Sequence, residues 1–262
     1  MKDKTKKLKE LMWNHKEQYD RVGVLKDAFK GETAYICTSG PTFNQFPSEK
    51  LNELLKDELV LSIKQTQHLI DDITDFHLLN FCNLTKYKYN NPNTIVGWAI
   101  WDESQPYTII ERFPVDFILD TYKLNDGSAK IENTMSHNDY WEGLDMNIDF
   151  SRPWGPGTMY ELAIPLALYM GCDKIVTIGW DLFKNTINSG QKQDDWFYNN
   201  IEYQNTKTLA GLNEHLMVAK KTKGLYEYLE KQDVELVIVD PDGDNSAYDK
   251  IKRIKSINDI KV

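Results

Sequence analysis

Short apolar runs recur along the chain and predict the strands of a largely parallel sheet. The runs are rich in β-branched residues and end at polar residues, as strands buried on both faces do. Helix-favouring stretches lie between several of them. This alternation predicts an α/β, Rossmann-like fold with right-handed crossovers and helices on both faces of the sheet. The expected strands cover residues 33–38, 59–63, 76–79, 94–100, 174–178 and 234–239, with short pieces at 109–110 or 117–119.

Residues 152–183 combine a glycine-lined loop, an apolar helix and a buried strand. Gly155 and Gly157 flank Pro156, and this loop can lie close to a ligand because glycine adopts turn conformations that a Cβ forbids. Thr158 then stands at the N-cap or in the first turn of a helix. Apolar residues follow at three- and four-residue steps, and we expect Gly171 to close the helix as its C′ residue.

Polar residues come directly after the predicted strands, and we expect a ligand site there. Ligands of open α/β sheets bind beyond the carboxyl ends of the strands. A strand that opens into a glycine-containing loop also presents free N–H groups to an anion. The loop SGPT alone is neither a Walker loop nor a dinucleotide fingerprint, so a plain turn is the alternative. The candidate ligand-binding residues are Thr38, Ser39, Gly40, Pro41, Thr42, Lys64, Gln65, Asn80, Gly155, Pro156, Gly157, Thr158 and Asp181.

Composition narrows the class of protein. The chain has 262 residues, a formal net charge of −9 and a pI near 5.1, which argues against a sequence-independent nucleic-acid binder with a basic face. The three cysteines lack metal-like spacing, and we expect buried thiols. The first residues show no secretory signal, and no apolar run reaches the ~18 residues of a membrane span. We therefore expect a cytoplasmic protein.

Three sequences occur in an order that resembles the bacterial sialyltransferase-type glycosyltransferases. They are GPT at residues 40–42, GT at 157–158 and GWD at 179–181. The same order is similar to that of the related motility accessory factors and pterin pyrophosphokinase-like enzymes. In these families the first loop reads roughly GNGPSL, a small-residue loop precedes a long helix, and the next strand ends in G-x-D. The similarity runs from about residue 30 to residue 240.

The resemblance implies a GT-A-like variant of the Rossmann fold and a nucleotide-sugar substrate. The donor would be a CMP-activated acidic sugar, such as sialic acid or Kdo, and the acceptor a glycan, with neither a metal nor another cofactor. By position, residues 38–42 would hold the nucleotide phosphate and ribose. Asn80 would meet the cytidine or the donor sugar, and residues 155–158 would close on the cytidine. Asp181 is open to three interpretations, as a ligand contact, a ribose partner or a helix cap.

A histidine is the expected general base, because its pKa near neutrality suits deprotonation of an acceptor hydroxyl. The resemblance places a histidine before the helix that leads to the last strand, and His215 is the nearest candidate. His137, in a polar and aromatic stretch, is the second. His68 and His77 are expected to have structural roles.

The chain also departs from the family pattern. A hydroxyl residue stands where the first loop of the family has an asparagine, and Phe183 stands where the family has a tyrosine. Two alternatives therefore remain. One is a Mg²⁺-dependent pyrophosphokinase-like enzyme or a UDP- or GDP-sugar transferase, in which paired aspartates at 194–195 or in DPDGD at 240–244 would hold the metal. For DPDGD we favour a turn. The other is a non-catalytic nucleotide-binding module.

The expected organisation has three parts. A helical leader covers residues 1–30, a single nucleotide-sugar-binding domain covers 31–245, and an amphipathic tail covers 246–262. Stretches near 122–150 and 185–208 are rich in Asn, Trp and Tyr, and act either as lids over the site or as surface insertions. We expect the tail to dock on the domain. Contact with a membrane surface or with a second copy of the chain is the alternative for this tail.

Overall fold

The computed structural model describes residues 1–18, 20–80, 87, 89–100, 115–122, 152–153, 158–182, 212–256 and 258–259. Within these ranges nine strands form one sheet in the order β6-β5-β4-β3-β2-β1-β7-β8-β9, and each neighbouring pair is parallel. The predicted α/β class with a mainly parallel sheet is therefore confirmed. The strands are β1 (Thr33–Cys37), β2 (Leu59–Ile63), β3 (Phe76–Asn80), β4 (Ile95–Ile100), β5 (Phe117–Tyr122), β6 (Arg152–Pro153), β7 (Lys174–Ile178), β8 (Glu235–Val239) and β9 (Lys252–Ile254).

The strand predictions agree closely with these bounds. β2 and β7 have the predicted ends, and the other long strands differ from prediction by one to three residues at an end. The piece expected at 109–110 lies outside the described residues. β6 and β9 were not predicted, because a strand of two or three residues is too short to show a periodic pattern.

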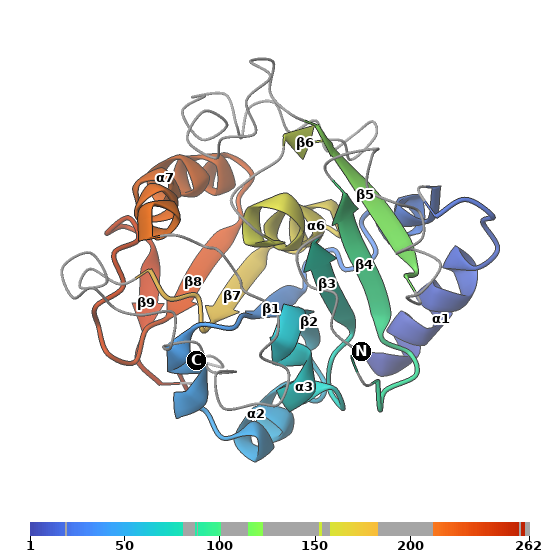
Figure 1. Cartoon of the computed structure of the whole chain (residues 1–262), viewed down its shortest axis with the longest axis horizontal. Helices are drawn as coiled ribbons and strands as arrows, with labels where there is room; N and C mark the ends of the chain where they lie inside the picture. The colour runs from blue at the N-terminus through green and yellow to red at the C-terminus, as the bar shows by residue number, and fades with distance from the viewer. Residues whose placement is uncertain are drawn as a thin grey trace.

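Helices cover both faces of the sheet, as predicted. One face packs against α1 (Lys2–Met12), η1 (Asp20–Leu25), η4 (Met159–Ala163), α6 (Ile164–Tyr169) and α7 (Leu212–Lys231). The other packs against η2 (Pro41–Gln45), α2 (Ser48–Leu55) and α3 (Gln67–Ile70), with η3 (Lys64–Thr66) joining β2 to α3. Figure 1 shows α7 beside β8 and β9 at one end of the sheet and α1 beside β4 and β5 at the other.

The two faces follow from alternation along each strand. In β1, Ala34 and Ile36 point to the first face, and Tyr35 and Cys37 to the second. All four are at most 4% exposed, so the run is continuously hydrophobic in sequence. Burial also raises the pKa of the Cys37 thiol to about 12, and the thiol is buried, as expected.

In the crossover from β6 to β7, the described part contains a π-helix, η4, which continues as α6. Pro165 has no N–H to extend the α-helical ladder, and the wider turn lies just before it. The helix ends at Gly171, as predicted. This glycine has φ +82°, its N–H donates to Leu168 O (2.9 Å), and the N–H of Cys172 donates to Ala167 O (3.0 Å), which is the Schellman pattern. Ser48 begins α2, and Pro47 holds the N-cap position.

The leader and the tail both pack on the sheet. Leu8 and Met12 of α1 are buried in the core of the first face, whereas Leu11 is 51% exposed. In the tail, Ile251 is buried and β9 extends the sheet beyond β8, so the expected docking is observed as far as Ile254. The last two isoleucines of the tail, at positions 257 and 260, lie outside the described residues. The two lid-like stretches also lie outside them, apart from Tyr122 at the end of β5.

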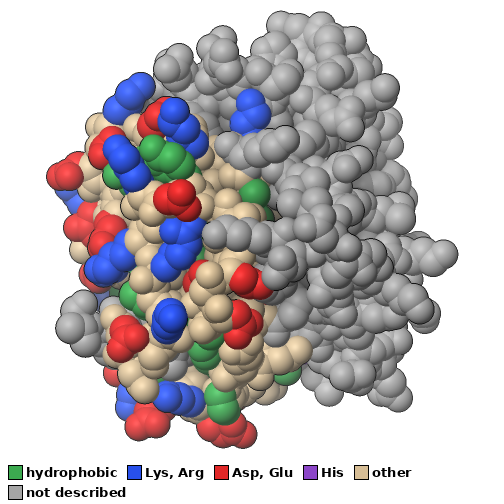
Figure 2. Space-filling model, turned by 90° about the vertical axis from the view of Figure 1, so that its left-hand side faces the viewer, with side chains coloured by type: hydrophobic (Ala, Val, Ile, Leu, Met, Phe, Trp, Pro, Cys, Tyr) green, Lys and Arg blue, Asp and Glu red, His purple; other side chains and the backbone are tan. Residues whose placement is uncertain are grey.

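Surface charges are mixed on the side shown in Figure 2. Lys and Arg side chains alternate with Asp and Glu over the described part of this side, and hydrophobic side chains form only small groups there. This part of the surface has no extended basic area. Across the described ranges, none of the helices combines the length and apolar character that crossing a bilayer requires.

Candidate functional site

The strand order creates a topological switch point between β1 and β7. From β1 the chain adds strands towards β6 on one side, then returns to place β7 on the other side of β1. Open α/β sheets bind ligands in the crevice at such a point, beyond the carboxyl ends of the strands. Here Cys37 at the end of β1 lies opposite Ile178 at the end of β7. The loops at 38–42 and 179–181 therefore begin side by side, at the carboxyl edge where the sequence predicted a ligand site.

Hydrogen bonds join these two loops into one unit, which we call the Thr42–Asp181 clamp. The Thr38 N–H donates to Ile178 O (2.8 Å), and the Gly40 N–H donates to Gly179 O (3.0 Å). The Thr38 hydroxyl also donates to Gly179 O. The Asp181 carboxylate accepts twice from Thr42, with Oδ2 bound to the N–H (2.8 Å) and Oδ1 to the hydroxyl (2.5 Å).

Two glycines make this close approach feasible. A Cβ on Gly40 would lie 2.2 Å from Gly179 O and 2.4 Å from Asp181 Oδ2, closer than carbon approaches oxygen. Gly179 has φ +76°, and a Cβ there would lie 2.7 Å from Thr38 O. The glycines of SGPT and GWD therefore serve the packing of one loop on the other, in addition to any approach to a ligand.

The role of Asp181 is that of a cap. Its carboxylate accepts the first N–H of η2 that is present, because Pro41 before it has none. Burial is the main cause that raises the pKa of Asp181, to about 6. The bonds from Thr42 lower the pKa, and the carboxylates of Asp244 and Asp240 add to the rise. Of the three interpretations of Asp181, the structure supports the helix cap.

The clamp changes what the first loop offers an anion. The N–H groups of Thr38, Gly40 and Thr42 all donate to protein oxygens, and the N–H of Phe43 donates to Gly40 O (3.0 Å). The expectation that this loop presents free N–H groups is therefore wrong at these positions. Ser39 is half-buried between the clamped residues. The contacts of residues 38–42 with a nucleotide remain predictions.

A second group of predicted residues follows β2. Lys64 begins η3 with an unusual φ of +52°, and Gln65 beside it is only 1% exposed. The carbonyl oxygen of Lys64 accepts a hydrogen bond from Nε2 of His77 (2.9 Å). Because a carbonyl only accepts, Nε2 carries the proton, and Nδ1 accepts from the Tyr89 hydroxyl (2.7 Å). Lys64 is thus at the expected edge, whereas the side chain of Gln65 is turned into the protein.

His77 has the structural role that was expected of it. Its ring is fully buried, and burial lowers its pKa to about 3, with His68 adding to the decrease and the bond to Lys64 opposing it. A neutral ring is consistent with one N–H donor and one acceptor. Sequence reasoning found the histidine but missed its partners, Tyr89 and the backbone of Lys64. The apolar surroundings of FHLL within a strand indicated its burial, but nothing local indicated the partners.

Thr158 lies at the same edge of the sheet. Since β6 is parallel to β5, the crossover that follows β6 begins at the carboxyl edge, and Thr158 occupies the N-cap position of η4. Its side chain is 3% exposed, and its hydroxyl has no hydrogen-bond partner among the described residues. A buried polar group without a partner is costly and uncommon, which makes this hydroxyl a candidate for contact with a ligand or with ordered water.

The remaining predicted residues are only partly placed. Asn80 ends β3 at the carboxyl edge, and nothing beyond its backbone position is described. His215 was expected before the helix, but α7 begins at Leu212, so His215 lies in its first turn, and its side chain lies outside the described residues. Positions 137 and 155–157 also lie outside them.

The acidic sequence DPDGD forms a turn after β8. Asp240 Oδ1 accepts the N–H of Gly243 (3.0 Å), and Oδ2 accepts the N–H of Asn245 (3.3 Å). The preferred interpretation of this sequence is therefore confirmed. Asn245 was not predicted to matter, yet its amide donates to Trp180 O (2.8 Å) and ties this turn to the GWD loop. Across the described ranges, no group of three His, Cys, Asp or Glu side chains is arranged to hold a metal ion.

A comparison of the chain with protein-family models found no match, and a comparison with curated protein sequences also found none. The structure therefore defines the class of the protein by its fold, as a doubly wound α/β protein with a switch point between β1 and β7. Its activity is a matter for proposal.

Proposed function

We propose that the chain is a glycosyltransferase that moves a CMP-activated acidic sugar onto a glycan acceptor without a metal. The observation that carries the proposal is the convergence of the SGPT loop, the GWD loop and Thr158 on the carboxyl edge of the sheet. These are the three sequences on which the resemblance to sialyltransferase-type enzymes rests. The resemblance is the reason for proposing a CMP-activated sugar as the donor. The switch point of the sheet is a suitable place for the donor to bind.

The chemistry of transfer needs charge stabilisation on the departing nucleotide phosphate. Because the clamp uses the amides of the first loop, we assign this task to groups outside it. The hydroxyl of Thr158, at the first turn of the crossover helix, is one candidate donor, and the helix N-terminus favours negative charge. Lys64, half-buried at the end of β2, is a candidate cation. His215, with His137 as the alternative, would deprotonate the acceptor hydroxyl.

A thermal-shift titration with CMP, CDP, UDP, GDP and ATP, each with and without Mg²⁺, tests the proposal. A ligand that binds only the folded state at about 100 times its Kd adds about 2.7 kcal/mol to the free energy of unfolding. We expect the largest rise in Tm with CMP, independent of Mg²⁺. A response only to ATP, UDP or GDP with Mg²⁺ would replace the proposal with a diphosphate-using enzyme. The absence of any nucleotide response would contradict both.

The Thr158→Val variant tests the assigned phosphate contact. Valine keeps the shape of threonine and removes a hydroxyl that has no partner in the described part of the chain, so the Tm without ligand should stay within about 2 °C. We expect the rise in Tm with CMP to be lost or greatly reduced. Thr177→Val is the matched control, because that hydroxyl is also buried and, as far as the structure is described, makes no hydrogen bond, but it lies within β7. An equal CMP response in both variants would remove Thr158 from the site.

A further inference from the structure

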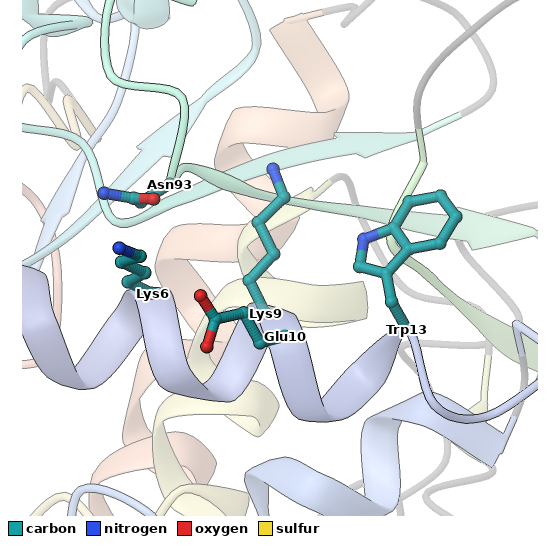
Figure 3. Close-up of a pocket in the computed structure, with 5 residues that line it drawn as sticks. All are labelled: Lys6, Lys9, Glu10, Trp13 and Asn93. Carbon is teal, nitrogen blue, oxygen red and sulfur yellow. The ribbon is translucent and has the colours of Figure 1, made fainter.

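A hollow of about 350 Å³ lies on α1, at the opposite edge of the sheet from the switch point. It is lined by Lys6, Lys9, Glu10 and Trp13, together with Asn93 just before β4. Figure 3 shows the α1 side chains projecting towards this hollow, with Asn93 near Lys6. The volume is within the range of small-ligand sites. The proposed transferase site does not include any of these residues.

Trp13 gives this hollow a fixed aromatic wall. Its Nε1 donates to Asp116 Oδ1 (2.9 Å), and the Arg21 guanidinium covers one face of the ring, 4.4 Å from its centroid, so a ligand would stack on the other face. The ring is nevertheless 56% exposed. If Trp13 were buried, its contacts would be ordinary core packing. Instead, the ring is held in place while much of its surface faces water. An indole that is both rigid and exposed offers contact area at low entropic cost.

The polar lining carries no net charge for a ligand. The ammonium group of Lys9 already donates to Thr94 O (2.5 Å) and Pro92 O (3.2 Å) and lies 3.4 Å from Asp116 Oδ2. This leaves one cation, Lys6, and one anion, Glu10, with the amide of Asn93. In the described part of the chain, these three side chains make no hydrogen bond or ion pair.

This combination selects among ligand classes. An anion such as phosphate would meet the carboxylate of Glu10 as well as the ammonium of Lys6. An aliphatic ligand would find a single aromatic ring and otherwise polar groups. A neutral sugar ring has an apolar face for stacking and a rim of hydroxyls that both donate and accept, which matches an indole beside an amide, an ammonium and a carboxylate.

We propose that this hollow binds a neutral sugar residue of a glycan, with the ring stacked on Trp13 and its hydroxyls bonded to Lys6, Glu10 and Asn93. The proposal goes beyond sugar transfer at the switch point and does not depend on it. A glycan held at this edge would be anchored to the protein away from the reaction centre.

Saturation-transfer difference NMR with the methyl glycosides of glucose, galactose, mannose and N-acetylglucosamine tests this inference. We expect at least one glycoside to show saturation transfer with the wild-type chain, with a Kd on the order of millimolar. The signal should be lost in Trp13→Ala and retained in Leu11→Ala. Leu11 is the matched control, since it is an exposed apolar residue of the same helix that does not line the hollow.

Trp13→Ala also removes the contacts with Asp116 and Arg21, so two milder variants accompany it. Lys6→Ala and Asn93→Ala break no hydrogen bond in the described part of the chain, and their Tm should match the wild type. Each should weaken glycoside binding at least threefold. The inference is overturned if none of the four glycosides binds at 20 mM, or if binding survives in Trp13→Ala. Failure of the CMP titration would leave these outcomes unchanged, so the two proposals fail separately.

Discussion

At the scale of single residues, the candidate site depends on two glycines and one carboxylate. Gly40 and Gly179 let the first loop pack on the loop after β7, and Asp181 then accepts both polar groups of Thr42. The clamp fixes the geometry of the switch point before any ligand arrives. Such preorganisation reduces the cost of ordering a loop on binding.

Substitution of Gly40 tests this packing. Its Cβ would overlap both Gly179 O and Asp181 Oδ2, and the first of these is backbone that cannot rotate away. We expect Gly40→Ala to lower the free energy of unfolding by roughly 1–3 kcal/mol, measured by urea denaturation. Gly23→Ala is the control, because no atom lies within 4 Å of the Cβ there and its change should be within about 0.5 kcal/mol. Equal stability of the two variants would contradict the clamp.

Asp181 predicts a pH dependence of stability. Its pKa is raised to about 6 in the folded state from an ordinary value of 3.8, so the folded chain holds this proton more tightly than the unfolded chain. The stabilising contribution is present in full below pH 4 and is lost as the pH rises to about 6. Between pH 4 and pH 6, the wild type should therefore lose about 2–3 kcal/mol of unfolding free energy relative to Asp181→Asn. A difference that is constant from pH 4 to pH 7 would show that the carboxyl pKa is not raised.

At the scale of elements, α1 is fastened to the amino edge of the sheet by two buried aspartates. Asp75 accepts the N–H of Val60 (3.0 Å) and contacts Lys2 (2.8 Å) and the Thr5 hydroxyl (2.8 Å). Asp116, two strands away, makes equivalent contacts. It accepts the N–H of Val96 (2.7 Å) and contacts Lys9 and Trp13 of the leader. The leader is thus tied to the sheet by polar contacts as well as by its apolar stripe.

Removal of one aspartate should therefore loosen this edge. Asp75→Ala leaves the Val60 N–H without its acceptor and removes the carboxylate from the Lys2 ammonium, which keeps its bond to Ile73 O, and we expect a loss of about 2–4 kcal/mol in a urea denaturation experiment. Asp72→Ala, at an exposed position nearby, should change stability by less than about 0.5 kcal/mol. If both variants are equally stable, α1 is held by its apolar residues alone.

At the scale of the whole molecule, the sequence predicts the strands well and the connections between distant parts poorly. LVLSI and KIVTI are buried on both faces, so their local composition alone marks them as strands. The clamp is different, because Thr42 and Asp181 are 139 positions apart and neither has a local signal for the other. The same holds for the bond between His77 and Tyr89, and for β9, which is a strand only because β8 offers an edge.

The candidate site was accordingly predicted in outline only. Four residues were expected at one edge of the sheet because each lies at the end of a predicted parallel strand, and the structure places them there: Thr38, Lys64, Asn80 and Asp181. It did not reveal which polar groups are already used within the protein. Asp181 and the loop amides serve the clamp, whereas the Thr158 hydroxyl is without a hydrogen-bond partner within the described ranges. That distinction needs three-dimensional contacts.

The most direct test of the central claim is a titration of the ¹⁵N-labelled chain with CMP, followed through the amide signals of its glycines. Gly40 and Gly179 lie at the switch point, and Gly31 and Gly171 lie together at the opposite edge, where the N–H of Gly31 donates to Gly171 O (3.0 Å). If a nucleotide binds beyond β1 and β7, the first pair should shift in a saturable manner while the second pair stays in place. Shifts confined to Gly31 and Gly171, or no shifts at any of the four, would contradict a nucleotide site at the switch point.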